Sequence, residues 1–224
     1  MSTAKNTANN TVNNTAQSTR TLRHPWSPEE DSAIRAGLLN GAVMTYPTET
    51  AYALGGNALL PGVAQAVYRL KAREADKALL LLIGGAEELP HLARDVSQAA
   101  RRLMARFWPG PLTLVFHASQ VCPPHLPDAR GTVALRWSPH PLLADLHRIA
   151  PVPLIGTSAN RSGEPPLHRC AAVLETFPGG IALALDGGPT PGGAPSTLVD
   201  TTVDPPRILR QGVISEAEIL AALG

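Results

Sequence analysis

The residues with the clearest chemical potential lie between Ile155 and Gly163, where a short apolar run passes into Thr, Ser, Asn and Gly residues. Hydroxyl and amide groups such as those of Ser158 and Asn160 both donate and accept hydrogen bonds, so they suit phosphate oxygens and a ribose. A strand that ends in such residues places them where an open α/β sheet commonly holds its ligand. The same residue types also favour a plain turn, so this segment alone leaves both interpretations open.

Further polar residues follow expected strand or helix ends and could contribute to the same site. Lys71 and Arg73 stand in a last helical turn, where cations also complement the helix dipole without any ligand. Arg136 follows an expected buried strand, and a buried charge needs a partner. Arg210 could instead belong to a surface ion pair. The small polar residues at comparable positions are Thr48, Thr50, Ser158, Asn160, Ser196 and Thr197.

The sequence lacks the common nucleotide and hydrolase motifs. It contains no glycine-rich phosphate loop ending in Lys and Ser or Thr, no Gly-x-Gly-x-x-Gly between a strand and a helix, and no Gly-x-Ser-x-Gly turn. A nucleotide site would therefore bind phosphates with separate cations, such as Lys71, Arg73 and Arg210, and with small polar groups. Such a site favours orientation of substrates and electrostatic stabilisation over covalent catalysis.

Composition excludes several classes of protein. The net charge of +1 over 224 residues provides no overall attraction to nucleic acid or membrane. No run approaches the ~20 apolar residues of a membrane span. Cys122 and Cys170 form no Cys-x-x-Cys pair, and the seven His show no metal-binding spacing. We therefore expect free thiols, a cytoplasmic protein and no metal held by protein ligands.

Alternating strand and helix patterns predict a single α/β domain with a twisted, mixed and mostly parallel sheet flanked by helices. Ser27-Pro-Glu-Glu30 and Ser215-Glu-Ala-Glu218 combine a serine N-cap with a glutamate three residues later, which marks two helix starts. Helices are also expected to end at 71–73 and to span 95–107, 139–149 and 170–177. The expected strands are 42–46, 78–83, 112–116, 132–136, 153–156, 181–185, 196–199 and a short one at 208.

Residues 1–22 differ from the rest of the chain. They are rich in Asn and Thr and have almost no large apolar side chains, so they cannot contribute to a core. They contain no apolar stretch of the kind found in secretory signals. We expect a disordered tail over 1–22 and one domain over 23–224.

Taken together, the chain resembles the YrdC-type threonylcarbamoyl-AMP synthases, which begin the synthesis of threonylcarbamoyladenosine at position 37 of tRNA. The resemblance is specific because seven motifs occur in the family's order, from about residue 27 to 215. They are Tyr46-Pro-Thr-Glu-Thr-Ala-Tyr52, Lys71-Ala-Arg73, Phe107-Trp-Pro-Gly-Pro-Leu-Thr113, Val133-Ala-Leu-Arg136, Thr157-Ser-Ala-Asn-Arg-Ser-Gly163, Pro195-Ser-Thr-Leu-Val-Asp200 and Leu209-Arg-Gln-Gly212.

The resemblance implies a YrdC-like domain with a concave, positively charged site. It implies a nucleotidyltransferase that forms threonylcarbamoyl-AMP, diphosphate and water from L-threonine, bicarbonate and ATP, with Mg²⁺ accompanying ATP. The product would pass to a tRNA threonylcarbamoyl transferase complex. By resemblance, Lys71, Arg73, Ser158 and Asn160 are catalytic, with Arg73, Ser158 and Asn160 also holding ATP. The further ATP contacts are Lys77, Thr132 and Arg210, and the threonine site comprises Thr50, Tyr52, Arg136 and Ser196.

Some positions depart from the family's pattern. Glu74 stands where the family commonly has proline, and Ala78 stands where it commonly has proline or glycine. Leu82 stands where some members carry a histidine that contacts threonine, and Lys77 replaces an asparagine. Two alternative functions remain open: a module of the same fold that binds tRNA or double-stranded RNA, and a paralogue that acts on another carbamoyl adenylate. The low net charge and the lack of an aromatic and arginine stacking platform disfavour the RNA module.

Overall fold

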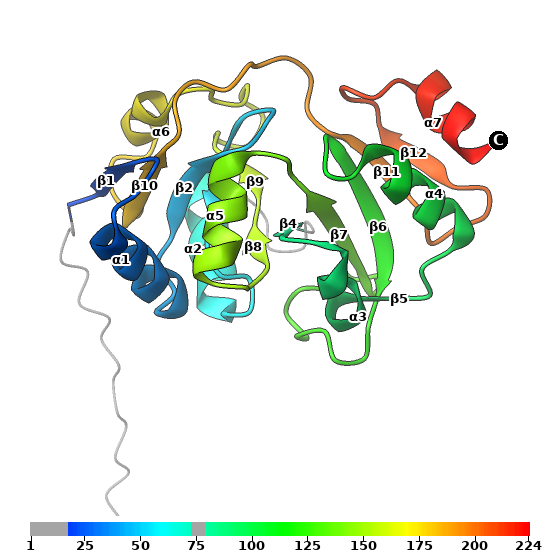
Figure 1. The fold of residues 1–224 in the computed structure, drawn as a ribbon, viewed down its shortest axis with the longest axis horizontal. Helices are drawn as coiled ribbons and strands as arrows, with labels where there is room; N and C mark the ends of the chain where they lie inside the picture. The colour runs from blue at the N-terminus through cyan, green and yellow to red at the C-terminus, as the bar shows by residue number, and fades with distance from the viewer. Residues whose placement is uncertain (1–17, 73–78) are drawn as a thin grey trace, which may run out of the picture.

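The computed structural model describes residues 18–72 and 79–224 and divides their strands between two mixed sheets (Figure 1). Figure 1 shows the two sheets side by side, with β4 and β8 in the middle of the molecule. Helices pack on the outside of both halves. Among these residues no helix is long and apolar enough to cross a membrane.

The first sheet orders five described strands as β1-β10-β2-β3-β9. β10 pairs in parallel with β1 and β2, whereas β3 is antiparallel to both β2 and β9. The Thr48–Ala51 turn joins β2 directly to β3, and this hairpin places its polar residues at one end of the sheet. The bounds are β1 Arg20–Arg23, β2 Met44–Pro47, β3 Tyr52–Gly55, β9 Thr157–Ser158 and β10 Leu183–Asp186.

The second sheet orders its described strands as β12-β11-β6-β7-β4-β8, with β5 paired to β6. β11 is parallel to β6 and β4 is parallel to β7, whereas the remaining pairs are antiparallel. The bounds are β4 Leu80–Ile83, β5 Ala93–Arg94, β6 Leu112–Ala118, β7 Thr132–Trp137, β8 Leu154–Ile155, β11 Thr197–Asp200 and β12 Arg207–Arg210.

The expectation of an α/β domain with a mixed sheet flanked by helices is confirmed, but the expectation of one mostly parallel sheet is wrong. Of the ten strand pairings among the described residues, four are parallel. Two adjacent strands can be antiparallel without a crossover helix, as in β2 and β3. Several strands also have only two to four residues, so their pairing depends on partners distant in the chain rather than on their own pattern.

The helices follow the local signals closely. Ser27 and Ser215 each cap a helix with a complete capping box, as predicted. The helix expected from Asp95 begins only after Ser97, because Asp95 has a positive φ of 54° and Ser97 accepts a hydrogen bond from Ala100 N. The helix bounds are α1 Pro28–Leu39, α2 Pro61–Lys71, α3 Leu89–Leu92 with the preceding short 3₁₀ turn Ala86–Glu88, α4 Gln98–Phe107, α5 Pro141–Ile149, α6 Cys170–Thr176 and α7 Glu216–Leu223.

The predicted end of the disordered tail at residue 22 is wrong. Residues 20–23 form β1, which pairs in register with β10, and the Thr19 hydroxyl donates to Ile181 O. Leu22 is only 3% exposed and joins the apolar cluster that contains Leu185. A single leucine among polar residues does not make a core segment visible in the sequence, since the burial comes from β10. Residues 1–17 lie outside the described part of the chain.

Two of the segments that pass between the sheets are described in full and position residues at the junction of the sheets. The segment 154–158 runs from β8 in one sheet into β9 in the other. Gly156 lies between them, where an added Cβ would stand 2.5 Å from the Leu82 side chain. The segment after β10 crosses at the opposite side to reach β11, as the orange chain at the top of Figure 1 shows.

Candidate functional site

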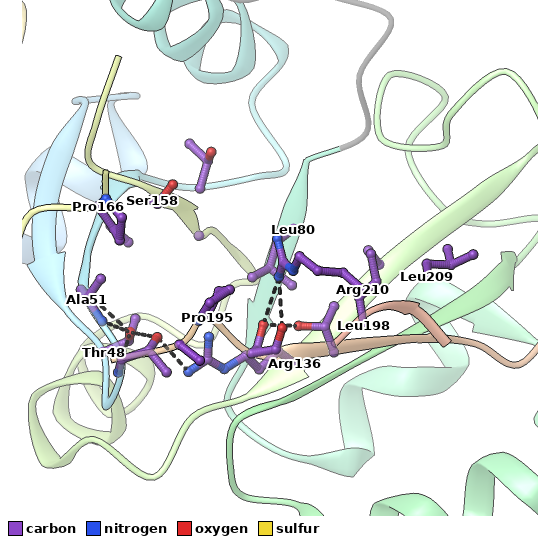
Figure 2. Close-up of a pocket in the computed structure, with 18 of the residues that line it drawn as sticks. Thr48, Ala51, Leu80, Arg136, Ser158, Pro166, Pro195, Leu198, Leu209 and Arg210 are labelled. Carbon is purple, nitrogen blue, oxygen red and sulfur yellow. Dashed lines mark hydrogen bonds between the residues drawn. The ribbon is translucent and has the colours of Figure 1, made fainter. Parts of the chain in front are cut away.

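A cavity of about 490 Å³ lies at the junction of the two sheets. Thr48, Thr50–Ala53 and Ser158 line it from the first sheet, and Arg136, Ser196 and Arg210 line it from the second. Figure 2 shows Arg136 and Arg210 near one another, with Ser158 and Pro166 on another side of the pocket. The cavity therefore exists only because both sheets contribute a wall.

The Ser158–Asn160 segment is held in place by a buried lysine. Lys71, which is 3% exposed, donates from its ammonium group to Ser158 O, to Asn160 O at 2.6 Å and to Asn160 Oδ1 at 3.3 Å. The Ser158 hydroxyl donates to Asn160 Oδ1, and Asn160 Nδ2 donates to Arg161 O and Glu164 O. These bonds fix the loop at the wall of the cavity, which both Ser158 and Asn160 line.

Arg136 lies in the opposite wall and is paired with an acid from the β2–β3 turn. The guanidinium is 3% exposed, and its Nη2 donates to Glu49 Oε1 and, at 3.2 Å, to Thr50 Oγ1. The Ser138 hydroxyl donates to the other oxygen of Glu49. Arg136 Nε is buried and has no hydrogen-bond partner among the described residues. Nη2 of the guanidinium is thus already hydrogen-bonded to Glu49 and Thr50, and Nε remains able to donate to a ligand.

Ser196 and Arg210 extend the same wall. The Ser196 hydroxyl lies 2.8 Å from Thr113 Oγ1, and Arg210 Nη2 donates to Ser196 O at 3.0 Å. Burial, and then the nearby charge of Arg136, lower the pKa of Arg210 from its usual range. Two guanidinium groups that disfavour each other's charge in a shared cavity are a suitable place for an anionic ligand.

The cavity is also lined by Thr132 and by a third arginine, Arg130. Arg130 contacts Asp128 at 3.2 Å, Asp200 at 3.4 Å and the Thr132 hydroxyl at 3.4 Å. The Thr132 backbone N–H donates to Asp128 Oδ1 at 2.9 Å. Because Arg130 is shared between two carboxylates, it contributes less net positive charge to the cavity than Arg210.

Tyr52 lines the cavity but directs its hydroxyl elsewhere. That hydroxyl donates to Gly188 O at 2.7 Å and lies 3.1 Å from Asp186 Oδ1. Burial, and then the charge of Asp186, raise the pKa of Tyr52 well above its usual range. The tyrosine therefore anchors the start of the segment that leads to Ser196.

The structure brings most of the predicted site residues to this one cavity. The residues that line it are Thr50, Tyr52, Thr132, Arg136, Ser158, Asn160, Ser196 and Arg210. Lys71 contacts the loop rather than appearing among the lining residues, and Arg73 and Lys77 lie outside the described residues, as do Glu74 and Ala78. Leu82 is fully buried in the apolar cluster of α5.

The sequence reasoning missed several polar residues at the site. Glu49 lies within the 46–52 motif but was not assigned a role, and it forms the ion pair with Arg136. Arg130 and Thr113 also line the cavity. The only sequence signal for Glu49 was the need of a buried Arg136 for a counter-charge, which does not identify the partner 87 residues away.

The fold and the site define a class: an α/β protein with a cavity that suits small anionic ligands. The model of the Sua5/YciO/YrdC family, described as "Telomere recombination", matches residues 36–212. The chain therefore belongs to the Sua5/YciO/YrdC family.

The relatives and solved structures agree with this assignment. The threonylcarbamoyl-AMP synthase of Pyrococcus abyssi is 38% identical over 192 residues, which cover 85% of this chain and 56% of that protein. The Thiobacillus denitrificans synthase is 38% identical over 167 residues, covering 75% of this chain and 88% of the relative. The crystal structure of P. abyssi Sua5 complexed with L-threonine superposes with a TM-score of 0.85 at 35% identity, covering 92% of this chain and 61% of the other.

The length of the match differs among the relatives. The chain spans little more than half of the P. abyssi protein, at 56%, and of the Bacillus subtilis synthase, at 54%. Escherichia coli YciO shares the fold, with a TM-score of 0.81 at 23% identity over 99% of its chain.

Proposed function

We propose that this protein is an L-threonylcarbamoyladenylate synthase, a nucleotidyltransferase that joins L-threonine, bicarbonate and ATP into threonylcarbamoyl-AMP with release of diphosphate and water. The observation that carries the proposal is that one cavity gathers Arg136, Thr50 and Ser196 together with Ser158 and Asn160. The likeness to a relative crystallised with L-threonine supports the choice of amino acid.

In this proposal the amino acid binds at Arg136. Its carboxylate accepts hydrogen bonds from the unpartnered Nε and from the Ser196 hydroxyl. The Thr50 hydroxyl, which accepts from Arg136 Nη2 at 3.2 Å and lies 3.0 Å from Thr48 Oγ1, keeps an acceptor position for the substrate's polar hydrogens. A buried guanidinium with an open donor provides orientation as well as affinity, because a bidentate or side-on contact fixes the carboxylate plane.

ATP binds in the same cavity, next to the amino acid. Ser158 and Thr132 contribute neutral hydrogen-bonding groups, Asn160 fixes the loop that carries Ser158, and Arg210 contributes a charge. Threonine's ammonium group loses a proton to solvent, the amine so formed combines with bicarbonate to give a carbamate and water, and a carbamate oxygen then attacks the α-phosphorus while diphosphate leaves. Arg210, with Arg73 as proposed from the resemblance, compensates the charge that develops on the phosphoryl oxygens.

Mg²⁺ fits this site as an ion that arrives with ATP. The described residues contain no group of three or more His, Cys, Asp or Glu side chains that could hold a metal. Mg²⁺ commonly binds nucleotides through phosphate oxygens, with water and one or two protein oxygens completing its shell. Glu164 and Asp128 are the carboxylates of the described cavity wall that could supply one. The ion would screen the triphosphate charge.

The proposed location and partners follow from the reaction. We propose that the protein acts in the cytoplasm, where the buried free thiols Cys122 and Cys170 would stay reduced. The product would be consumed by a tRNA threonylcarbamoyl transferase complex, with contact to tRNA made by that complex or by this chain.

Diphosphate release by the purified full chain tests the proposal. We expect release from ATP with Mg²⁺ only when both L-threonine and bicarbonate are present, with an AMP adduct of threonylcarbamate detected by mass spectrometry. Turnover that ignores threonine but follows another carbamoyl donor would favour the paralogue. Absence of turnover together with salt-sensitive binding of double-stranded RNA would favour the RNA module.

A further inference from the structure

Glu49 stands out because it is an acid placed against the arginine of an anion site. Its carboxylate accepts hydrogen bonds from both Arg136 Nη2 and the Ser138 hydroxyl. The Arg136 side chain is 4% exposed and that of Glu49 is 19% exposed, so the pair is poorly screened by water. Ser138 is buried and directly follows β7, so two groups from the end of that strand hold the carboxylate.

This pairing has two consequences for Arg136. It directs the guanidinium, since Nη2 is occupied by Glu49 and Thr50 whereas the buried Nε has no partner in the part of the chain that the structure describes. It also nearly cancels the charge of Arg136, so the wall next to Thr50 carries a positive and a negative group side by side. A lone buried guanidinium would attract any small anion, including free phosphate, whereas a balanced pair attracts such anions weakly.

The arrangement is complementary to a zwitterion. An α-amino acid presents a carboxylate and an ammonium group separated by one carbon atom; Arg136 can pair with the carboxylate, and the negative field of Glu49 favours the nearby ammonium group. Glu49 is not among the described residues that line the cavity. It therefore acts through Arg136 and through its electric field, and not as a group that touches the reacting atoms.

We propose that Glu49 is a positioning and specificity-determining residue that makes the site select an α-amino acid over simple carboxylates and phosphate. The inference rests on the proposed function, because it takes L-threonine as the ligand of Arg136. It goes further by assigning the discrimination to a residue outside the cavity wall. Ser138, which donates to Glu49, helps to hold the Glu49 carboxylate in place beside Arg136.

Calorimetric titration of the full chain with two ligands tests the inference. The ligands are L-threonine and 3-hydroxybutanoate, which is the same molecule without its amino group. We expect Glu49→Gln to weaken threonine binding by at least about tenfold while 3-hydroxybutanoate binds equally well or better, because only the zwitterion loses an opposite charge. Glu49→Asp, which restores the charge, should recover part of the selectivity, and Ser138→Ala should show a smaller loss.

The control is Glu175→Gln, the same change at an exposed position of α6 outside the cavity. It should leave both affinities unchanged. Equal weakening of both ligands in Glu49→Gln, or no weakening of threonine, overturns the inference even if wild-type turnover is intact. A wild-type protein that does not bind threonine overturns the proposed function and this inference with it. Circular dichroism and urea unfolding identify a variant that has simply lost its fold.

Discussion

Replacement of Lys71 by methionine should show whether this lysine stabilises the fold or binds phosphate directly. Lys71 ends α2 and directs its ammonium group at the backbone of the Ser158–Asn160 loop. Methionine keeps the length and apolar character of the side chain but removes all three N–H donors. The Ser158 and Asn160 carbonyls would then lose a charged partner in a buried place.

The magnitude follows from the number of bonds. Hydrogen bonds to a charged group contribute ~1.5–3 kcal/mol each, and Lys71 makes two strong ones, to Ser158 O and Asn160 O. The loss is partly offset, since the ammonium group no longer has to be taken out of water. We expect a net destabilisation of about 3 kcal/mol, equivalent to a fall of roughly 6–12 °C in Tm for a domain of this size. ATP affinity should fall by about tenfold or more as the loop moves.

Urea unfolding and ATP titration of the same preparations provide the two measurements. Arg69→Met is the matched control, because Arg69 is an exposed cation in the same helical turn. It should change the free energy of unfolding by less than about 0.5 kcal/mol. The reasoning is refuted if Lys71→Met loses ATP affinity at unchanged stability, which would identify the ammonium group as a direct phosphate ligand.

Three further predictions concern other parts of the chain. Deletion of 1–22 should cost about 2 kcal/mol in urea unfolding, because Leu22 is 3% exposed and β1 pairs with β10; deletion of 1–17 is the control, and equal stability of the two truncations would contradict the strand. Arg136→Ala should lower stability by about 3 kcal/mol and raise the threonine requirement far more than the ATP requirement, because Glu49 is left without its cation; a selective loss of ATP affinity would argue against it. Burial lowers the pKa of His147 from 6.5 to about 4. The folded state therefore favours the neutral imidazole, and the stability that this preference gives the fold is complete above pH 6.5 and is lost as the pH falls toward 4. His147→Leu should therefore remove roughly 3 kcal/mol of the acid dependence of unfolding between these values, and identical pH profiles for variant and wild type would exclude this.

Local signals were sufficient for much of the fold. The capping boxes at Ser27 and Ser215 depend on residues three positions apart, so they are visible in the sequence and appear in the structure. The strand at 112–116 is a long apolar run that pairs on both sides, and its burial follows from its own residues. The tail boundary was missed because β1 is ordered by its partner β10 rather than by its own composition.

By itself, the sequence determined the α/β class, the helix starts and, through ordered motifs, the set of residues that meet at the cavity. Only the tertiary structure determined which of those residues contact each other and which of them line the cavity. Lys71 contacts backbone carbonyls 87 and 89 residues away, and Glu49 reaches Arg136 across 87 residues. Side-chain type and spacing specify short-range hydrogen bonds, because the backbone fixes the distance between near neighbours. A bond between distant residues depends on the packing of whole sheets, and only the assembled fold determines which donor meets which acceptor.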